Sequence, residues 1–110
     1  MSDKSSLGEF EQLVLLAVLR VEGEAYGAPV WDAIVRRSGR DVTLGTVYKT
    51  LMRLETKGLL RSRLGDPTPE RGGRRKRLYE PTASGRRALE RSLRALRRMA
   101  EGLDLAAGTP

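Results

Sequence analysis

Cysteine and histidine are absent from this chain of 110 residues, and aromatic side chains make up only 5% of it. Without cysteine and histidine, the chain cannot form disulfides, the usual zinc sites, a catalytic thiolate or a histidine acid–base pair. Clustered carboxylates, a glycine-rich phosphate loop and a nucleophile–base pair are also missing from the sequence. We therefore expect no catalytic residues, no metal and no cofactor, and an enzyme is the least expected class.

Long apolar runs are missing as well. The sequence contains no stretch of about 18 apolar residues, the length needed to cross a membrane. Residues 1–6 also lack the basic-then-apolar layout of a signal peptide. We expect a cytoplasmic protein with no membrane partner. A content of 39% hydrophobic and 32% charged residues is typical of one compact globular domain at this length.

The positive charge is concentrated in the middle of the chain. Residues 1–35 carry two basic and six acidic side chains, whereas residues 36–98 carry nineteen basic and six acidic ones. The net charge of the whole chain is +7. Such a block favours a polyanionic partner, because lysine and arginine displace the counterions condensed on nucleic acids.

The segment 43–58 is the most informative part of the sequence. Thr43 is suited to cap a helix and Gly58 to end it in the left-handed conformation. At 100° per residue, an apolar row would face the core and a polar-basic row would face outward. This pattern is typical of a DNA-reading helix, although an ordinary surface helix also has a solvated face. The apolar row is Leu44, Val47, Leu51 and Leu54, and the polar-basic row is Thr46, Lys49 and Arg53.

Two further helices are predicted before this segment, at residues 8–22 and 26–38. Short turns separate the three helices, which is the helix-turn-helix layout. Apolar residues cover more than one side of the first helix, so we expect one side to pack inward and another to meet a partner chain. Coverage of that second side by the same chain is the alternative. The residues expected to meet a partner are Leu15, Leu16 and Leu19.

A hairpin is predicted after the third helix. Residues 59–65 alternate in a strand-like rhythm, residues 75–81 would form the returning strand, and the prolines and glycines between them mark a long loop. Basic residues crowd near the tip of this wing, where we expect them to reach phosphates or a narrow groove. A solvated charge run is the alternative. These residues are Arg71, Arg74, Arg75, Lys76 and Arg77.

The last predicted helix spans residues 82–103, with Thr82 as its cap. Its leucines recur at alternating spacings of four and three, which is the seam of a coiled coil and requires another helix. We expect this seam to pack against the first helix of a second copy. The seam consists of Leu89, Leu93, Leu96, Ala100 and Leu103. Residues 1–7 and 104–110 are expected to be flexible ends, so that residues 8–81 form the DNA-binding domain and residues 82–103 the dimerisation helix.

Four blocks of the sequence stand out by their order and spacing: Leu7–Glu11, Tyr26–Gly27, Gly45–Leu59 and Arg77–Gly85. Together they span most of the chain. In these blocks the chain resembles the PadR-like family of bacterial transcriptional regulators.

The resemblance implies a winged helix-turn-helix homodimer, usually a repressor, that binds a palindromic operator through its third helix and wing. It also implies that Tyr48 and Lys49 touch the DNA backbone. A chain this short is similar to the compact branch of the family, which has a single C-terminal helix. That helix contains no aromatic residue, so it offers little for stacking a flat inducer. Candidate residues for a small-molecule pocket are Phe10, Leu13, Trp31 and Met99.

The sequence thus predicts a sequence-specific DNA-binding repressor of mainly α structure with a small β-hairpin (α+β). The face from Leu44 to Arg53 would enter a major groove of double-stranded DNA, with Thr43 and Tyr48 holding phosphates. A basic protein that binds DNA or RNA without reading sequence, and a winged-helix adaptor for other proteins, remain alternatives.

Overall fold

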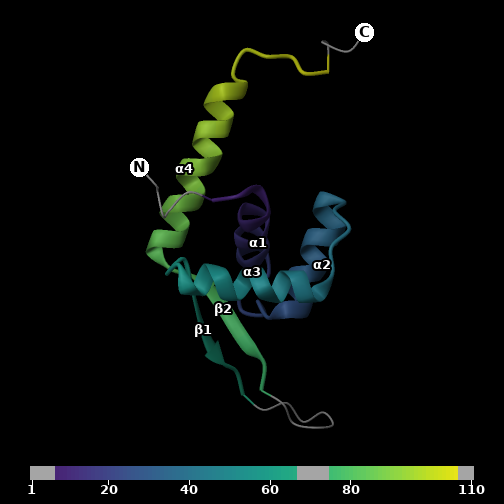
Figure 1. Ribbon diagram of the computed structural model, residues 1–110, viewed down its shortest axis with the longest axis vertical. Helices are drawn as coiled ribbons and strands as arrows, with labels where there is room; N and C mark the ends of the chain where they lie inside the picture. The colour runs from purple at the N-terminus through teal and green to yellow at the C-terminus, as the bar shows by residue number, and fades with distance from the viewer. Residues whose placement is uncertain (1–6, 67–74, 107–110) are drawn as a thin grey trace.

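The computed structural model describes residues 7–66 and 75–106, and it has three helices, a two-stranded antiparallel hairpin and a fourth helix (Figure 1). This order confirms the predicted winged helix-turn-helix with an added C-terminal helix. None of the helices within the described ranges is long and apolar enough to cross a membrane. The elements are α1 (Glu9–Arg20), α2 (Gly27–Ser38), α3 (Leu44–Thr56), β1 (Leu60–Leu64), β2 (Arg77–Pro81) and α4 (Ala83–Ala100).

The predicted helix boundaries follow from local chemistry. The Thr43 hydroxyl accepts a hydrogen bond from the backbone N–H of Thr46, and the Thr82 hydroxyl accepts one from Gly85. Each side chain thereby satisfies one of the backbone donors that a helix start leaves unpaired. Gly58 has φ +79°, a value that disfavours any residue with a Cβ, and it turns the chain from α3 into β1.

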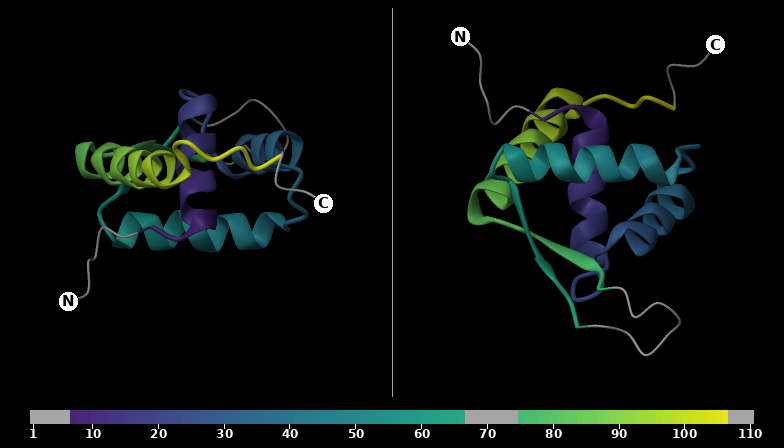
Figure 2. Two further views of the ribbon diagram at one scale, coloured as in Figure 1. Left: turned by 90° about the horizontal axis from the view of Figure 1, so that it is seen from above. Right: turned by 60° about the horizontal axis from the view of Figure 1, so that its bottom comes forward.

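The first helix lies at the centre of the molecule. It contacts α2, α3, α4 and β2, and the view from above shows it between α2 and α4 with α3 crossing its end (Figure 2). Because its own chain surrounds it on several sides, Leu15 is only 1% exposed and belongs to the core. The prediction that Leu15 meets a partner chain is therefore wrong, and the alternative of coverage by the same chain holds for this residue.

Three other predictions need correction. Leu7, assigned to a flexible end, is buried in the core; the rest of that segment, residues 1–6, lies outside the described residues. Leu44, assigned to the inward row of the third helix, is exposed. The last helix ends at Ala100, because the chain turns at Gly102 with φ +80°, so Leu103 does not extend the helical seam.

The C-terminal helix leaves the body of the protein at an end opposite the hairpin (Figure 1). Its first turns pack against the core through Ala88 and Leu89. Every residue from 94 to 100 is exposed. The second half of α4 therefore stands free of the chain that carries it. Of the predicted tail, residues 104–106 are described and exposed, and residues 107–110 lie outside the described part.

Candidate nucleic-acid interface

The third helix presents the predicted polar-basic row to solvent. Val47, Leu51 and Leu54 are fully buried on its inner side, where the Thr50 hydroxyl also lies and donates to the backbone carbonyl of Thr46 at 3.1 Å. That bond satisfies the one polar side chain on the buried face. The opposite side carries the residues assigned from the sequence to DNA contact, all of them exposed: Thr43, Leu44, Thr46, Tyr48, Lys49 and Arg53.

A close contact between two helices fixes Tyr48. The backbone of Gly27, the first residue of α2, approaches the Tyr48 ring so closely that a Cβ at Gly27 would lie 2.4 Å from the Tyr48 Cζ atom. No larger residue fits there without moving the ring. This contact gives a physical reason for the Tyr26–Gly27 pair in the sequence, which periodicity alone did not explain. It also directs the Tyr48 hydroxyl toward the start of α2.

The hairpin is tied to the helices at three places. The backbone N–H of Tyr79 donates to the carbonyl of Ala25 at 2.9 Å. The Lys76 ammonium donates to the Tyr26 hydroxyl at 3.1 Å and lies 4.3 Å from the centre of that ring. At the end of α3, the Ser62 hydroxyl donates to Glu55 at 2.7 Å. The wing therefore holds a defined position relative to the third helix.

The basic residues of the wing divide into distinct environments. Lys76 folds back onto Tyr26 and is half-buried, and Arg77 donates to the Ser62 hydroxyl at 2.9 Å. Arg75 is exposed. Arg71 and Arg74 lie outside the described residues. DNA contact by these side chains stays a prediction, and Lys76 and Arg77 have structural roles that the sequence did not reveal.

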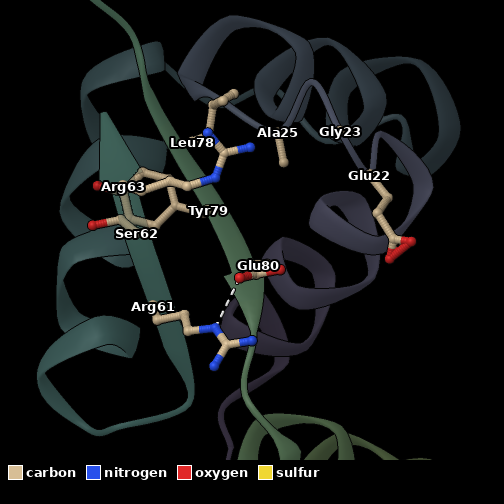
Figure 3. A pocket seen from close by; sticks show the side chains of 9 residues that line it. All are labelled: Glu22, Gly23, Ala25, Arg61, Ser62, Arg63, Leu78, Tyr79 and Glu80. Atoms are coloured by element: carbon tan, nitrogen blue, oxygen red, sulfur yellow. Dashed lines mark hydrogen bonds and ion pairs between the residues drawn. The ribbon is translucent and has the colours of Figure 1, made fainter. Parts of the chain in front are cut away.

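A cavity of about 420 Å³ lies between the wing and the turn that follows α1. Figure 3 shows Arg61 paired with Glu80 on the strand side and Glu22 on the facing wall. Burial, reinforced by the carboxylate of Glu55, raises the pKa of the Tyr79 phenol. Arg61 is paired with Glu80, and Arg63 also lines the cavity.

A partly buried ion pair, between the buried carboxylate of Glu11 and the more exposed ammonium of Lys57, connects the first helix to the end of the third. Glu11 is 7% exposed, and its carboxylate accepts hydrogen bonds from the Lys57 ammonium at 2.8 and 3.1 Å and from the Gly8 backbone N–H at 3.0 Å. Burial alone would raise the pKa of Glu11, but the bonds from Lys57 and Gly8 outweigh it and lower that pKa. This pair could not be predicted from the sequence, because its members are 46 residues apart.

Four of the eight residues assigned to dimerisation meet at a groove between α1 and α4. The groove has a volume of about 450 Å³, and Leu16, Leu19, Leu89 and Leu93 line it together with charged residues at its rim. Leu89 is 5% exposed because its own chain buries it, so the prediction that it packs against a second copy is wrong, as it is for Leu15. Leu96 and Ala100 continue the seam on the free half of α4. The apolar groove and the free seam thus form one continuous surface along α4.

The candidate pocket residues do not come together within one chain. Trp31 packs against the core, and its indole N–H donates to the carbonyl of Val42 at 2.7 Å. Phe10 lies beneath the guanidinium of Arg40. Leu13 lines a different groove, between α1 and α2, and Met99 is 78% exposed on α4. The position of Trp31 is therefore explained by core packing and its hydrogen bond to Val42.

Comparison with known proteins identifies the family. Residues 15–91 match the family model described as the transcriptional regulator PadR-like family, which is well over half of the chain. The chain belongs to the PadR-like family of transcriptional regulators. PadR-like proteins regulate transcription and bind DNA; they are not enzymes.

The chain is also similar to a curated transcriptional regulator and, in its fold, to solved structures. The chain is 41% identical over 81 residues to the transcriptional regulator Rv3488 of Mycobacterium tuberculosis, covering 72% of this chain and 69% of that protein. A PadR family regulator from Clostridium difficile R20291 superimposes with a TM-score of 0.71 at 24% identity, covering 92% and 100% of the two chains. A PadR-like regulator from Bacillus cereus gives the same TM-score at 18% identity, covering 92% and 93%.

Proposed function

We propose that this PadR-like regulator is a repressor that binds a palindromic operator as a homodimer. The observation that carries the proposal is the exposed polar-basic face of α3, on a capped helix whose opposite face is fully buried. A helix held this firmly can present side chains to base edges in a fixed geometry. Repression follows from occupancy, because a protein bound tightly at a promoter excludes competing proteins.

Within this proposal the side chains of α3 have separate roles. Lys49 and Arg53 supply positive charge to the groove, and Arg53 offers the forked donor that suits guanine. Thr43 and Tyr48 lie at the margin of the face, where hydroxyls can hold phosphates. The wing, tied to both α2 and the end of α3, would bring its basic residues to the flanking backbone or minor groove.

The homodimer is supported by the apolar surface along α4. A free helix with a leucine seam is not stable alone in water, and it gains most by packing against another apolar helix. The groove between α1 and α4 offers such a surface on a second copy. We accordingly assign residues 8–81 to DNA binding and the helix that starts at residue 83 to dimerisation. The two recognition helices would then meet half-sites about 34 Å apart, or a multiple of that distance.

A binding selection from random duplexes tests the proposed function. The proposal predicts enrichment of a palindromic sequence that binds at least 10³-fold more tightly than scrambled DNA, the lower end of the range typical of specific regulators. Equal affinity for all duplexes with a steep salt dependence would instead support a nucleoid-like protein. Weak binding to every duplex would support a protein adaptor.

Arg53→Ala is expected to weaken binding to the selected operator by about 1–3 kcal/mol and to relax the preference at one base pair. The matched control is Arg98→Ala, which removes the same charge from an exposed position on the free half of α4. Affinities for operator and scrambled duplexes are measured for each variant by competition titration. Equal losses on both duplexes for Arg53→Ala would contradict base reading by this residue.

Leu96→Glu is expected to convert the dimer to a monomer, because a carboxylate in the seam would lose its hydration on association. Sedimentation velocity should then report a mass near the 12.2 kDa of one chain rather than about twice that value. Arg98→Ala changes the net charge by the same amount on another side of α4 and should stay dimeric. A wild-type protein that sediments as a monomer at micromolar concentration would contradict the dimer.

A further inference from the structure

The exposed face of α3 has an apolar flank beside its basic one. Leu44 is 37% exposed, Tyr48 is 44% exposed and Met52 is 61% exposed. Their four-residue spacing places them in one line along the helix. The inner face of α3 is already complete without them, since Val47, Thr50, Leu51 and Leu54 fill it. The sequence contained the signal for this flank, but Leu44 was counted both in the inward row and in the DNA-contacting face, and Met52 in neither.

Met52 lies near the middle of the outward surface. At 100° per residue, Met52 and Lys49 each fall about 30° from the direction opposite the buried row, on either side of it. Arg53 and Thr46 continue the basic side. Leu44, the first residue of the helix, lies about 70° from the middle of the buried row and is 37% exposed, so it forms the inner edge of the apolar side. Tyr48, held over Gly27, is directed toward α2. The two aliphatic side chains free to enter a groove on this flank are therefore Leu44 and Met52.

An apolar side chain has one matching partner in the major groove. The base edges there present hydrogen-bond donors and acceptors. The one apolar group among them is the 5-methyl group of thymine. The surrounding charge also favours DNA as the partner of this flank, because Lys49 and Arg53 lie exposed beside Met52 on the same helix. A protein partner would have to leave these cations without counterions or supply acidic groups of its own.

We propose that Met52 reads a thymine methyl group in the major groove and that Leu44 reads a second one. This inference rests on the proposed function, since it assumes that α3 enters the groove. Eight residues of helix separate the two side chains by about 12 Å, so the two thymines should lie roughly three to four base pairs apart in each half-site. Thymine at these positions then contributes to operator choice in addition to any base read by Arg53.

Deoxyuridine provides the test, because it removes only the methyl group and keeps the base pair. Each thymine of the selected operator is replaced in turn, and affinities are measured for the wild type, Met52→Ala and Leu44→Ala. The wild type should lose about fourfold at each contacted thymine, the factor that corresponds to burying one methyl group. Met52→Ala should lose this sensitivity at one position and Leu44→Ala at the other. Lys49→Ala is the control: it should bind every duplex more weakly and keep the wild-type deoxyuridine pattern.

The outcomes separate this inference from the proposed function. Selection without an enriched sequence would overturn both. An enriched operator whose affinity is unchanged by deoxyuridine, or whose deoxyuridine pattern is the same in wild type and both alanine variants, would overturn the methyl contact and leave the sequence-reading regulator standing. Thermal unfolding of Met52→Ala serves as the folding check, and its midpoint should match the wild type because the side chain is exposed.

Discussion

Replacing Gly85 by alanine is expected to lower the free energy of unfolding by about 3 kcal/mol or more. A Cβ at this position would lie 2.0 Å from the backbone carbonyl oxygen of Leu59 and 3.0 Å from its carbonyl carbon. A backbone carbonyl cannot rotate away as a side chain can, so the first turn of α4 would have to separate from the turn between α3 and β1. The hydrogen bonds of Thr82 to the Leu59 and Gly58 carbonyls, at 3.1 and 2.7 Å, would be lost with it.

The control for this substitution is Gly45→Ala, in the first turn of α3. A Cβ there meets only the Thr43 hydroxyl at 3.9 Å, which is an ordinary contact. Alanine has the higher helix propensity, so this change should stabilise the protein by up to about 1 kcal/mol. Urea unfolding of both variants measures whether each substitution raises or lowers the free energy of unfolding. A Gly85→Ala protein as stable as Gly45→Ala would show that the contact with Leu59 is looser than described.

Lys57→Met is expected to destabilise the protein by about 3 kcal/mol at pH 7. Methionine keeps the apolar stem of the side chain but removes the ammonium group. The carboxylate of Glu11 would then remain buried with only the Gly8 N–H as a partner. An unpaired buried charge costs far more than the pair itself contributes, which is why removing one partner has a large effect.

The effect of Lys57→Met should depend on pH in a defined direction. In the wild type the pKa of folded Glu11 lies below its ordinary value of 4.5, so its contribution to stability is complete above pH 4.5 and is lost as the pH falls through the folded pKa. In the variant, burial is no longer outweighed, and the pKa of Glu11 rises. The stability difference between the two proteins should therefore begin to shrink above pH 4.5, at the raised pKa of the variant, and should keep shrinking below pH 4.5 as the pH falls through the lowered pKa of the wild type.

Arg61→Met is the control for this pair, because the Arg61–Glu80 pair is exposed on both sides. Solvent screens such pairs, and the cost should stay below about 1 kcal/mol at any pH. The urea midpoints of the wild type, Lys57→Met and Arg61→Met are measured at pH 7 and at pH 3.5, and the stability loss of each variant is compared between the two pH values. A difference between wild type and Lys57→Met that is the same at both pH values would show that the charge of Glu11 is not its source.

Local signals in the sequence were sufficient to predict most of the elements. Thr43 and Thr82 cap helices because their hydroxyls act on backbone groups three residues away, and Gly58 turns the chain because of its own conformational freedom. The rows Val47, Leu51 and Leu54 follow from helical periodicity alone. Each of these features depends on neighbours in the chain, which a sequence displays directly.

Features that depend on distant neighbours could not be predicted in this way. Periodicity gives the direction of a side chain but not what covers it, so Leu15 was taken for a partner-facing residue although its own chain buries it. The contact between Gly27 and Tyr48 and the ion pair between Glu11 and Lys57 each join elements whose separation in space is fixed only by the folded core.

The attachment of Gly85 and Thr82 to the carbonyls of the preceding turn has a mechanical consequence. It joins α4 to the core that carries α3, so that the two move as one unit. With 18 residues, α4 is about 27 Å long. In the proposed dimer, a change of about 10° in the angle between the two paired α4 helices would displace each α3 by roughly 5 Å. This is more than the ~3.4 Å rise of one base pair. The spacing of half-sites that such a regulator accepts is then set by the packing angle of its C-terminal helices, far from any base it touches.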